Sequence, residues 1–175
     1  MKDLPIYYCN LDEGAEGILT MSFVEFPAVE INWLEFSEEK PLYFSDEKQH
    51  IVTSVALRAD FPIYRRRGEE EFYVVFTKEN IQKMVEKFFK EDRIKSVNLN
   101  HSEPTNGCYL IESYFAKDGN QFNVKDGSWI CSYKIENPEV WKQIKDGKFN
   151  GFSVEGYLNL SEQDELEDYI DKIIE

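Results

Sequence analysis

Short runs of β-branched and aromatic residues, each ended by a turn signal, are the feature that most restricts how this 175-residue chain can fold. Runs of this length and composition are typical of strands, and glycine beside aspartate or asparagine marks the turns between them. We expect strands over residues 51–57, 61–65, 71–76, 96–99, 107–115, 129–135 and 151–160. Residues 17–36, which Pro27 interrupts, suit two strands or a strand and a loop.

Helical spacing of apolar residues is confined to three segments. Thr77 precedes the clearest of them, and Asn137 and Pro138 begin a second helix that ends before Gly147. Residues 161–175 are predicted to form an acidic amphipathic C-terminal helix. Many strands with two or three helices indicate an α+β, β-rich fold, either a barrel or a sheet with surrounding helices.

The length and charge of the chain limit its function. A chain of 175 residues suits one domain, which we place over residues 1–175 with a core at about 15–160. Asp and Glu number 34 against 20 Lys and Arg, so the net charge of -14 argues against nucleic-acid or membrane-surface binding. Residues 1–5 lack the apolar stretch of a secretory signal, so we expect a cytoplasmic location.

Few residues in this chain are candidates for catalysis or for binding a metal or cofactor. Three cysteines without a CxxC spacing argue against a disulfide framework or a zinc cluster, and no phosphate-binding loop occurs, so we expect no cofactor. Of the two histidines, His101 follows a predicted strand and precedes a turn, where it can face a cleft. His50 lies in a polar stretch, and we interpret it as a structural or surface residue. Ser153, between Gly151 and Gly156, suits a nucleophile or a hydrogen-bonded strand serine.

Five segments, standing in the expected order, carry a family resemblance: IVTSVALRADFPIYRR, EEFYVVFTKENIQKMVEKFF, VNLNHS, CYLIESYF and DGSWICSYKIENPEVWKQIKDGKFNGFSVEG. The chain resembles the XkdF-type phage serine protease family, which is related to the prohead (capsid maturation) proteases. The resemblance implies a fold like that of the herpesvirus assemblins, a distorted β-barrel with surrounding helices. It also implies a serine endopeptidase that cuts scaffold and capsid protein segments.

The resemblance assigns two roles directly. The histidine of the family's N-[LI]-x-H segment falls on His101, the general base, and the serine of its G-[FW]-S-[IV]-E-G segment falls on Ser153, the nucleophile. The third group stays open between Glu155, on the same side of its strand as Ser153, and Glu112, on a strand that we expect beside the His101 strand. We prefer Glu155. The assemblins use a second histidine here, and His50 lies in no matching motif.

Other features allow alternatives. The paired arginines that follow the serine in assemblins have no counterpart, because no arginine follows Arg93, so the oxyanion stabiliser is unassigned. The run at residues 65–67 could dock an acidic peptide or a phosphate, but the glutamates at 69–71 favour a charged hairpin tip. Cys108 and Cys131 are expected in the core, and a cysteine protease built on Cys108 and His101 has no motif behind it.

The leading expectation is a prohead maturation protease that works in the host bacterial cytoplasm, within the assembling prohead. Its substrates would be phage capsid and scaffold proteins, and a homodimer is expected. One alternative is a catalytically silent assembly or scaffold protein that keeps the protease fold and binds capsid or portal subunits. Another is a stand-alone host binding domain, which would require the family resemblance to be wrong.

Overall fold

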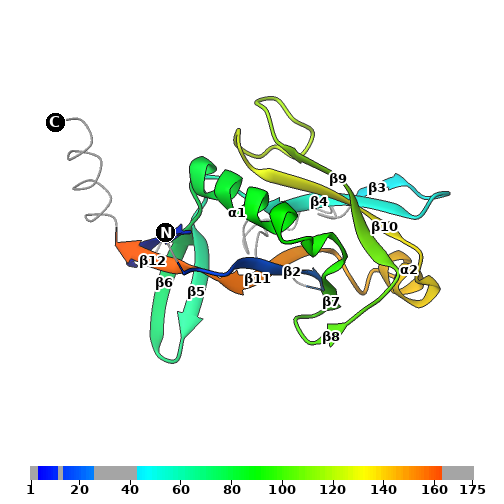
Figure 1. Cartoon of the computed structure of the whole chain (residues 1–175), viewed down its shortest axis with the longest axis horizontal. Coiled ribbons are helices and arrows are strands. Elements are labelled where there is room, and N and C mark those ends of the chain that lie inside the picture. Colours follow the sequence, from blue (N-terminus) through cyan, green and yellow to red (C-terminus); the bar gives the residue numbers. More distant parts are fainter. Residues whose placement is uncertain (1–3, 12–13, 26–42, 163–175) are drawn as a thin grey trace.

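Strand-forming runs and two capped helices give the chain a β-rich α+β fold, as its sequence predicts (Figure 1). The structure, a computed structural model, describes residues 4–11, 14–25 and 43–162. The strands are β1 (Ile6–Asn10), β2 (Gly17–Val24), β3 (Tyr43–Asp46), β4 (Ile51–Leu57), β5 (Ile63–Arg67), β6 (Glu70–Val75), β7 (Val97–Leu99), β8 (Glu103–Pro104), β9 (Cys108–Phe115), β10 (Trp129–Ile135), β11 (Gly151–Tyr157) and β12 (Asn159–Glu162). The helices are α1 (Lys78–Lys90), the 3₁₀ turn η1 (Arg93–Lys95) and α2 (Pro138–Lys145).

The described strands form three separate sheets, each of four strands: β12-β1-β6-β5, β3-β4-β10-β9 and β11-β2-β7-β8. Each sheet has two edge strands, so the described strands do not close into the barrel that the family resemblance implied. The shortness of β7 and β8 explains part of the difference between the implied barrel and the observed sheets. β7 has three residues and β8 two, so hydrogen bonding in their sheet ends there.

The sheet β11-β2-β7-β8 separates polar from apolar side chains. Ser153 pairs with Ser22 and Val154 with Met21 across the antiparallel β2–β11 ladder, and Ser22 pairs in turn with Asn98 on β7. Because opposed residues point to the same face, Ser22, Asn98 and Ser153 share one face. Val154 and Met21 share the other, which packs against the core. Because of this alternation, one face of the sheet carries polar side chains that can take part in a reaction.

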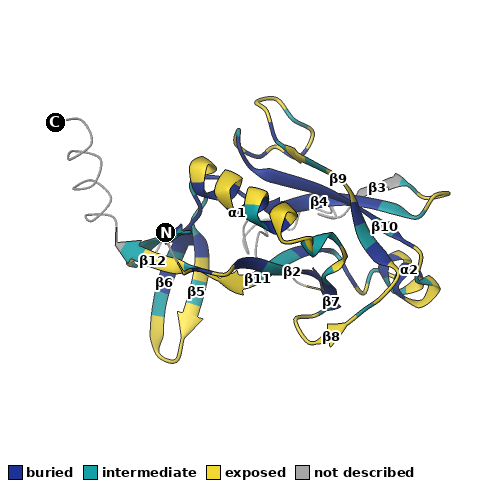
Figure 2. Ribbon diagram, in the orientation of Figure 1, coloured by how far each residue is buried: buried dark blue, intermediate teal, exposed yellow. Residues whose placement is uncertain are grey.

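The core joins all three sheets. β4 and β10 are buried along nearly their whole length, which Figure 2 shows as dark blue ribbons. The Trp129 side chain, which is fully buried, lies with its ring 5.5 Å from the Phe88 ring of α1. Tyr133 packs edge-on against Phe23 and Phe152. One cluster of buried apolar side chains therefore links α1, β10 and the sheet that carries Ser153.

Both helices begin where the sequence predicts. The Thr77 hydroxyl accepts a hydrogen bond from the Asn80 N–H of α1 at 3.2 Å. The Asn137 side chain accepts from two N–H groups of α2, and Pro138 occupies the first turn. None of the helices in the described ranges is long and apolar enough to cross a membrane.

Four strands were not predicted, and one of them, β8, lies where the sequence indicated a turn. β3 and β1 lie in segments for which no element was expected. The helix predicted over 161–175 does not begin at Ser161, because Ser161 and Glu162 belong to β12 and pair with β1. The rest of that predicted helix, 163–175, lies outside the described residues.

Candidate active site

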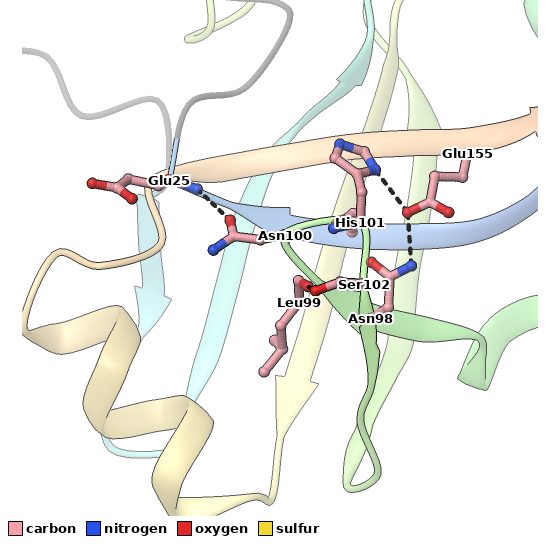
Figure 3. A network of polar contacts seen from close by, with 8 residues as sticks. Glu25, Asn98, Leu99, Asn100, His101, Ser102 and Glu155 are labelled. Carbon is pink, nitrogen blue, oxygen red and sulfur yellow. Dashed lines mark hydrogen bonds and ion pairs between the residues drawn. The ribbon is translucent and has the colours of Figure 1, made fainter.

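His101 lies in a tight turn that follows β7 and is fastened to β2. Asn100 and His101 both have positive φ, 47° and 57°, a left-handed conformation that non-glycine residues seldom adopt. The Asn100 N–H donates to the Phe23 carbonyl at 2.9 Å, and the His101 N–H donates to the Ser22 hydroxyl oxygen at 2.9 Å. The Asn100 side chain accepts from the Glu25 N–H at 3.1 Å (Figure 3). These bonds hold the imidazole over the polar face of the sheet.

Glu155 contacts the histidine directly. Its Oε1 atom lies 2.7 Å from His101 Nδ1 and accepts a second hydrogen bond from Asn98 Nδ2, also at 2.7 Å (Figure 3). The His101 and Glu155 side chains are 44% and 35% exposed, so water and a substrate can reach them. A carboxylate at Nδ1 favours the tautomer with its proton on that nitrogen. Nε2 then carries a lone pair that can accept a proton.

Ser153 lies on the same face as Glu155, two residues earlier on β11. It is half-buried and stands directly opposite Ser22, with a Cα separation of about 4.5–5.5 Å for such a pair. Ser22 is the residue whose hydroxyl receives the His101 N–H. The Ser153 hydroxyl makes no hydrogen bond with any described residue. The structure thus gathers Ser153, His101 and Glu155 on one face of one sheet.

Glu112 lies elsewhere, and the strand pairing expected for it was wrong. β9 pairs with β10 rather than with β7, which pairs with β2 and β8. The Glu112 carboxylate accepts a hydrogen bond from the Ser132 hydroxyl at 2.6 Å. β10 lies between β9 and β4 in its sheet, so Glu112 belongs to a sheet other than that of Ser153 and His101.

The cysteines are poor nucleophiles in this fold. Cys108 is 2% exposed and Cys131 is fully buried, as the sequence predicts. Burial raises the pKa of the Cys108 thiol to about 12 and that of Cys131 well above its ordinary value. Because the thiolate is the reactive form, neutral thiols in the core do not suit a cysteine protease.

His50 packs against α2. Its ring stacks on the Trp141 indole, with ring centroids 4.4 Å apart and planes 17° from parallel. This contact agrees with the structural role expected from its polar surroundings.

Two residues that contact this site were missed in the sequence. Asn98 is 9% exposed, and its Oδ1 atom is buried without a partner among the described residues while its Nδ2 holds Glu155. Ser22 is fully buried and fixes the His101 backbone. A signal for Asn98 existed, because alternation along β7 places Asn98 and Leu99 on opposite faces. Ser22 carries no such signal, since its role depends on the β2–β7 pairing.

A serine, a histidine and a carboxylate on one sheet face define a candidate hydrolase of the Ser–His–acid class. The chain belongs to the family described as "Putative phage serine protease XkdF", which matches residues 41–162. This confirms the resemblance seen in the sequence.

Two curated proteins of Bacillus subtilis (strain 168) are similar to the chain. It is 28% identical over 163 residues to "Phage-like element PBSX protein XkdF", covering 84% of this chain and 56% of that protein. It is 32% identical over 92 residues to "Uncharacterized protein YqbD", covering 51% of this chain and 28% of that protein. The chain therefore spans little more than half of the first relative and less of the second. No solved structure matches the chain.

Proposed function

We propose that this chain is a serine endopeptidase with Ser153 as nucleophile, His101 as general base and Glu155 as the carboxylate that orients the histidine. The observation that carries the proposal is the 2.7 Å contact between His101 Nδ1 and Glu155 Oε1. This contact lies on the sheet face that also presents Ser153. Membership in a family named for a phage serine protease supports the same reaction class.

The proposed reaction gives each of these three groups one role. His101 Nε2 takes the proton of the Ser153 hydroxyl as its oxygen attacks the carbonyl carbon of the peptide bond. Glu155 stabilises the imidazolium through Nδ1–H. The protonated Nε2 then gives its proton to the leaving amine, and the C–N bond breaks. Water, deprotonated by the same nitrogen, then attacks the acyl carbon. The ester C–O bond breaks, and Nε2 returns the proton to the Ser153 oxygen.

The proposed biological setting is phage prohead maturation. The substrates are scaffold and capsid proteins, cut in the host bacterial cytoplasm within the assembling prohead, and the enzyme acts as a homodimer. The word "phage" in the names of the family and of one relative supports this setting. A shell that holds protease and substrate together raises their effective concentration, so weak binding of each substrate segment suffices.

The test is intact-mass spectrometry of the protein mixed with its cognate capsid and scaffold proteins. The samples are wild type, Ser153→Ala, His101→Ala, Glu155→Gln and the matched control Glu112→Gln, with the folding of each checked by circular dichroism. We expect defined fragments from wild type and Glu112→Gln, none from Ser153→Ala or His101→Ala, and at least tenfold fewer from Glu155→Gln.

Two other results would contradict the proposal. Fragments that persist in Ser153→Ala contradict the assigned nucleophile. If no sample yields fragments, even at high concentration, the protease assignment fails. The alternative is then a catalytically silent protein that keeps this fold and binds capsid or portal subunits.

A further inference from the structure

A cavity of about 310 Å³ lies next to Ser153, lined by residues of β11 and of the hairpin of β5 and β6. Ser153 is one of its lining residues, and apolar side chains such as Leu57, Val74 and Val154 make up most of the wall. The lining also includes Leu160, which is exposed, so the cavity extends to the surface of the described residues. Its volume falls within the range of about 300–1,000 Å³ that ligand pockets occupy.

Arginine supplies the charge in this cavity. The charged residues in its lining are Arg65 and Arg66, both on β5. Arg65 lies on the same face of β5 as Ile63, which is buried, and it pairs across the hairpin with Phe72. Ile63 and Phe72 also line the cavity. The Arg65 side chain therefore lies on the apolar inner face of the hairpin, and burial lowers its pKa.

The Arg65 guanidinium lacks a carboxylate partner among the described residues. Its Nη1 donates to the Tyr64 carbonyl at 3.0 Å. Two residues on, Arg67 is exposed and forms an ion pair with Glu70 at 3.0 Å. Cys9 also lines the cavity, but burial raises the pKa of its thiol to about 12, so it stays neutral at pH 7. A half-buried cation without an anion is costly, and a carboxylate forms the strongest hydrogen bonds with it.

The position of β11 indicates the form of the ligand. Among the described strands, β11 is an edge strand, which pairs with β2 on one side only. The backbone groups on its other side can therefore pair with an extended chain, as sheet edges do in many peptide complexes. An extended peptide along β11 would direct alternate side chains to the Val154 face, toward the cavity, and the others to the face that presents Ser153.

We infer that the cavity is a substrate subsite for an extended peptide that places a large apolar side chain against the apolar wall and, within two residues of it, an aspartate or glutamate against Arg65. This inference deepens the proposed function and rests on it, because Ser153 lines the same cavity. It names the substrate class as acidic peptide segments with a leucine, isoleucine, methionine or phenylalanine beside the acid.

The first arm of the test measures binding without cleavage. Fluorescein-labelled nonapeptides carry leucine and glutamate adjacent or separated by one residue, and matched peptides replace leucine by alanine or glutamate by glutamine or lysine. Binding to Ser153→Ala is followed by fluorescence anisotropy. We expect the best leucine–glutamate peptide to bind about tenfold more tightly than each matched peptide, because one charged hydrogen bond or one buried apolar side chain is lost.

Variants of the hairpin test the role of Arg65. In the Ser153→Ala background, Arg65→Gln is expected to bind the glutamate and glutamine peptides equally, and Arg65→Glu to prefer the lysine peptide. Arg67→Gln, on the same strand but outside the cavity lining, is the matched control and is expected to keep the preference for glutamate. Loss of this preference in Arg67→Gln but not in Arg65→Gln overturns the assignment.

The second arm measures cleavage of the same peptides by the wild-type chain, read by mass spectrometry. Arg65-dependent binding without cleavage supports the subsite and contradicts the protease. Cleavage without preference for leucine or glutamate supports the protease and overturns the subsite. If the peptides are neither bound nor cleaved, both the subsite and the protease are overturned. Arg65-dependent binding of dodecanoate, with no peptide bound, overturns the peptide and identifies a fatty-acid site instead.

Discussion

At the scale of single residues, Asn98 is the clearest case of a side chain that acts through another. Its Nδ2 donates to the Glu155 oxygen that His101 also contacts. We predict that Asn98→Ala lowers kcat about tenfold, because one hydrogen bond to a charged group contributes about 1.5 kcal/mol. KM should stay unchanged, since Asn98 does not line the substrate cavity. Steady-state kinetics on a cleaved peptide measures both constants.

A double-mutant comparison separates positioning by Asn98 from a merely structural role. If Asn98 acts through Glu155, then Asn98→Ala adds little to the loss already present in Glu155→Gln. Losses that multiply in the double variant would show that Asn98 supports the site by another route.

The buried thiol of Cys108 predicts a pH dependence of stability. Burial raises its pKa from 9.0 to about 12, so above pH 9 the unfolded chain releases a proton that the folded chain keeps. The free energy of unfolding therefore falls as pH rises from 9 to 12, by up to about 1.4 kcal/mol per pH unit from this thiol. Urea titrations between pH 9 and 11 should show a shallower fall for Cys108→Ala than for wild type.

The control for this prediction is Val140→Ala, which also truncates a buried side chain but removes no titrating group. Val140→Ala should lower stability at every pH and keep the wild-type slope. A Cys108→Ala slope equal to that of wild type would contradict the raised pKa.

The residues of the site were predictable to different degrees. Ser153 and His101 were assigned through the family resemblance of the short segments that contain them, and both roles stay predictions. The choice between Glu155 and Glu112 depended on which strands pair, and the expected pairing of β9 with β7 was wrong. Ser22 was missed because a serine inside an apolar strand gives no local sign of its role. It accepts a hydrogen bond from His101, which lies 79 residues later in the chain.

At the scale of elements, β11 depends on a close contact with β2. A Cβ atom added at Gly156 would lie 2.0 Å from the Gly17 carbonyl oxygen, next to the register shift that follows Glu155. Because the obstacle is backbone, the two strands would have to separate. We predict that Gly156→Ala lowers the free energy of unfolding by about 3 kcal/mol and reduces cleavage, since Glu155 moves with the strand.

The control for this variant is Gly119→Ala. Gly119 has a φ of +76°, but a Cβ atom there meets nothing within 4 Å. Its substitution should cost about 1 kcal/mol and leave cleavage unchanged. Denaturant titration measures the free energy of unfolding, and the peptide assay measures cleavage. Equal effects of the two substitutions would show that the contact with Gly17 is unimportant.

Elements with strong local signals were predicted well, and those that depend on partners were not. α1 and α2 begin at capping side chains that satisfy free N–H groups within a few residues. β1 is a strand because it lies between β6 and β12, and its own five residues mix aromatic and polar side chains. Ser161 and Glu162 are drawn into β12 by pairing with β1, which overrides their helix-like pattern.

At the scale of the whole molecule, the net charge of -14 predicts a response to salt. Like charges repel more strongly in the compact chain than in the unfolded one, and salt screens this repulsion beyond about 10 Å at 0.1 M. We predict that the urea midpoint rises between 20 mM and 500 mM NaCl. Glu69→Lys with Glu103→Lys changes the charge by two units each, from -14 to -10, and should reduce the rise. A midpoint that salt leaves unchanged or lowers would contradict the argument.

The arrangement of the sheets was the part least accessible from sequence. The β-rich α+β class follows from the number of strand-like runs and capped helices. The parallel pairs β1–β6 and β2–β7, however, join segments tens of residues apart, and no local pattern specifies which distant strands meet. The closed barrel implied by the family resemblance is replaced, in the described strands, by three sheets with open edges.

The order in which the site's parts appear along the chain has a consequence for biosynthesis. Ser22 lies on β2, His101 follows β7, and the proposed nucleophile and its acidic partner lie together on β11. A ribosome working from the N-terminus makes the histidine turn early and the serine late. Under the proposed function, an emerging chain therefore gains its activity only after β11 has left the exit tunnel and paired with β2. The order of synthesis would then keep the chain from digesting itself during translation.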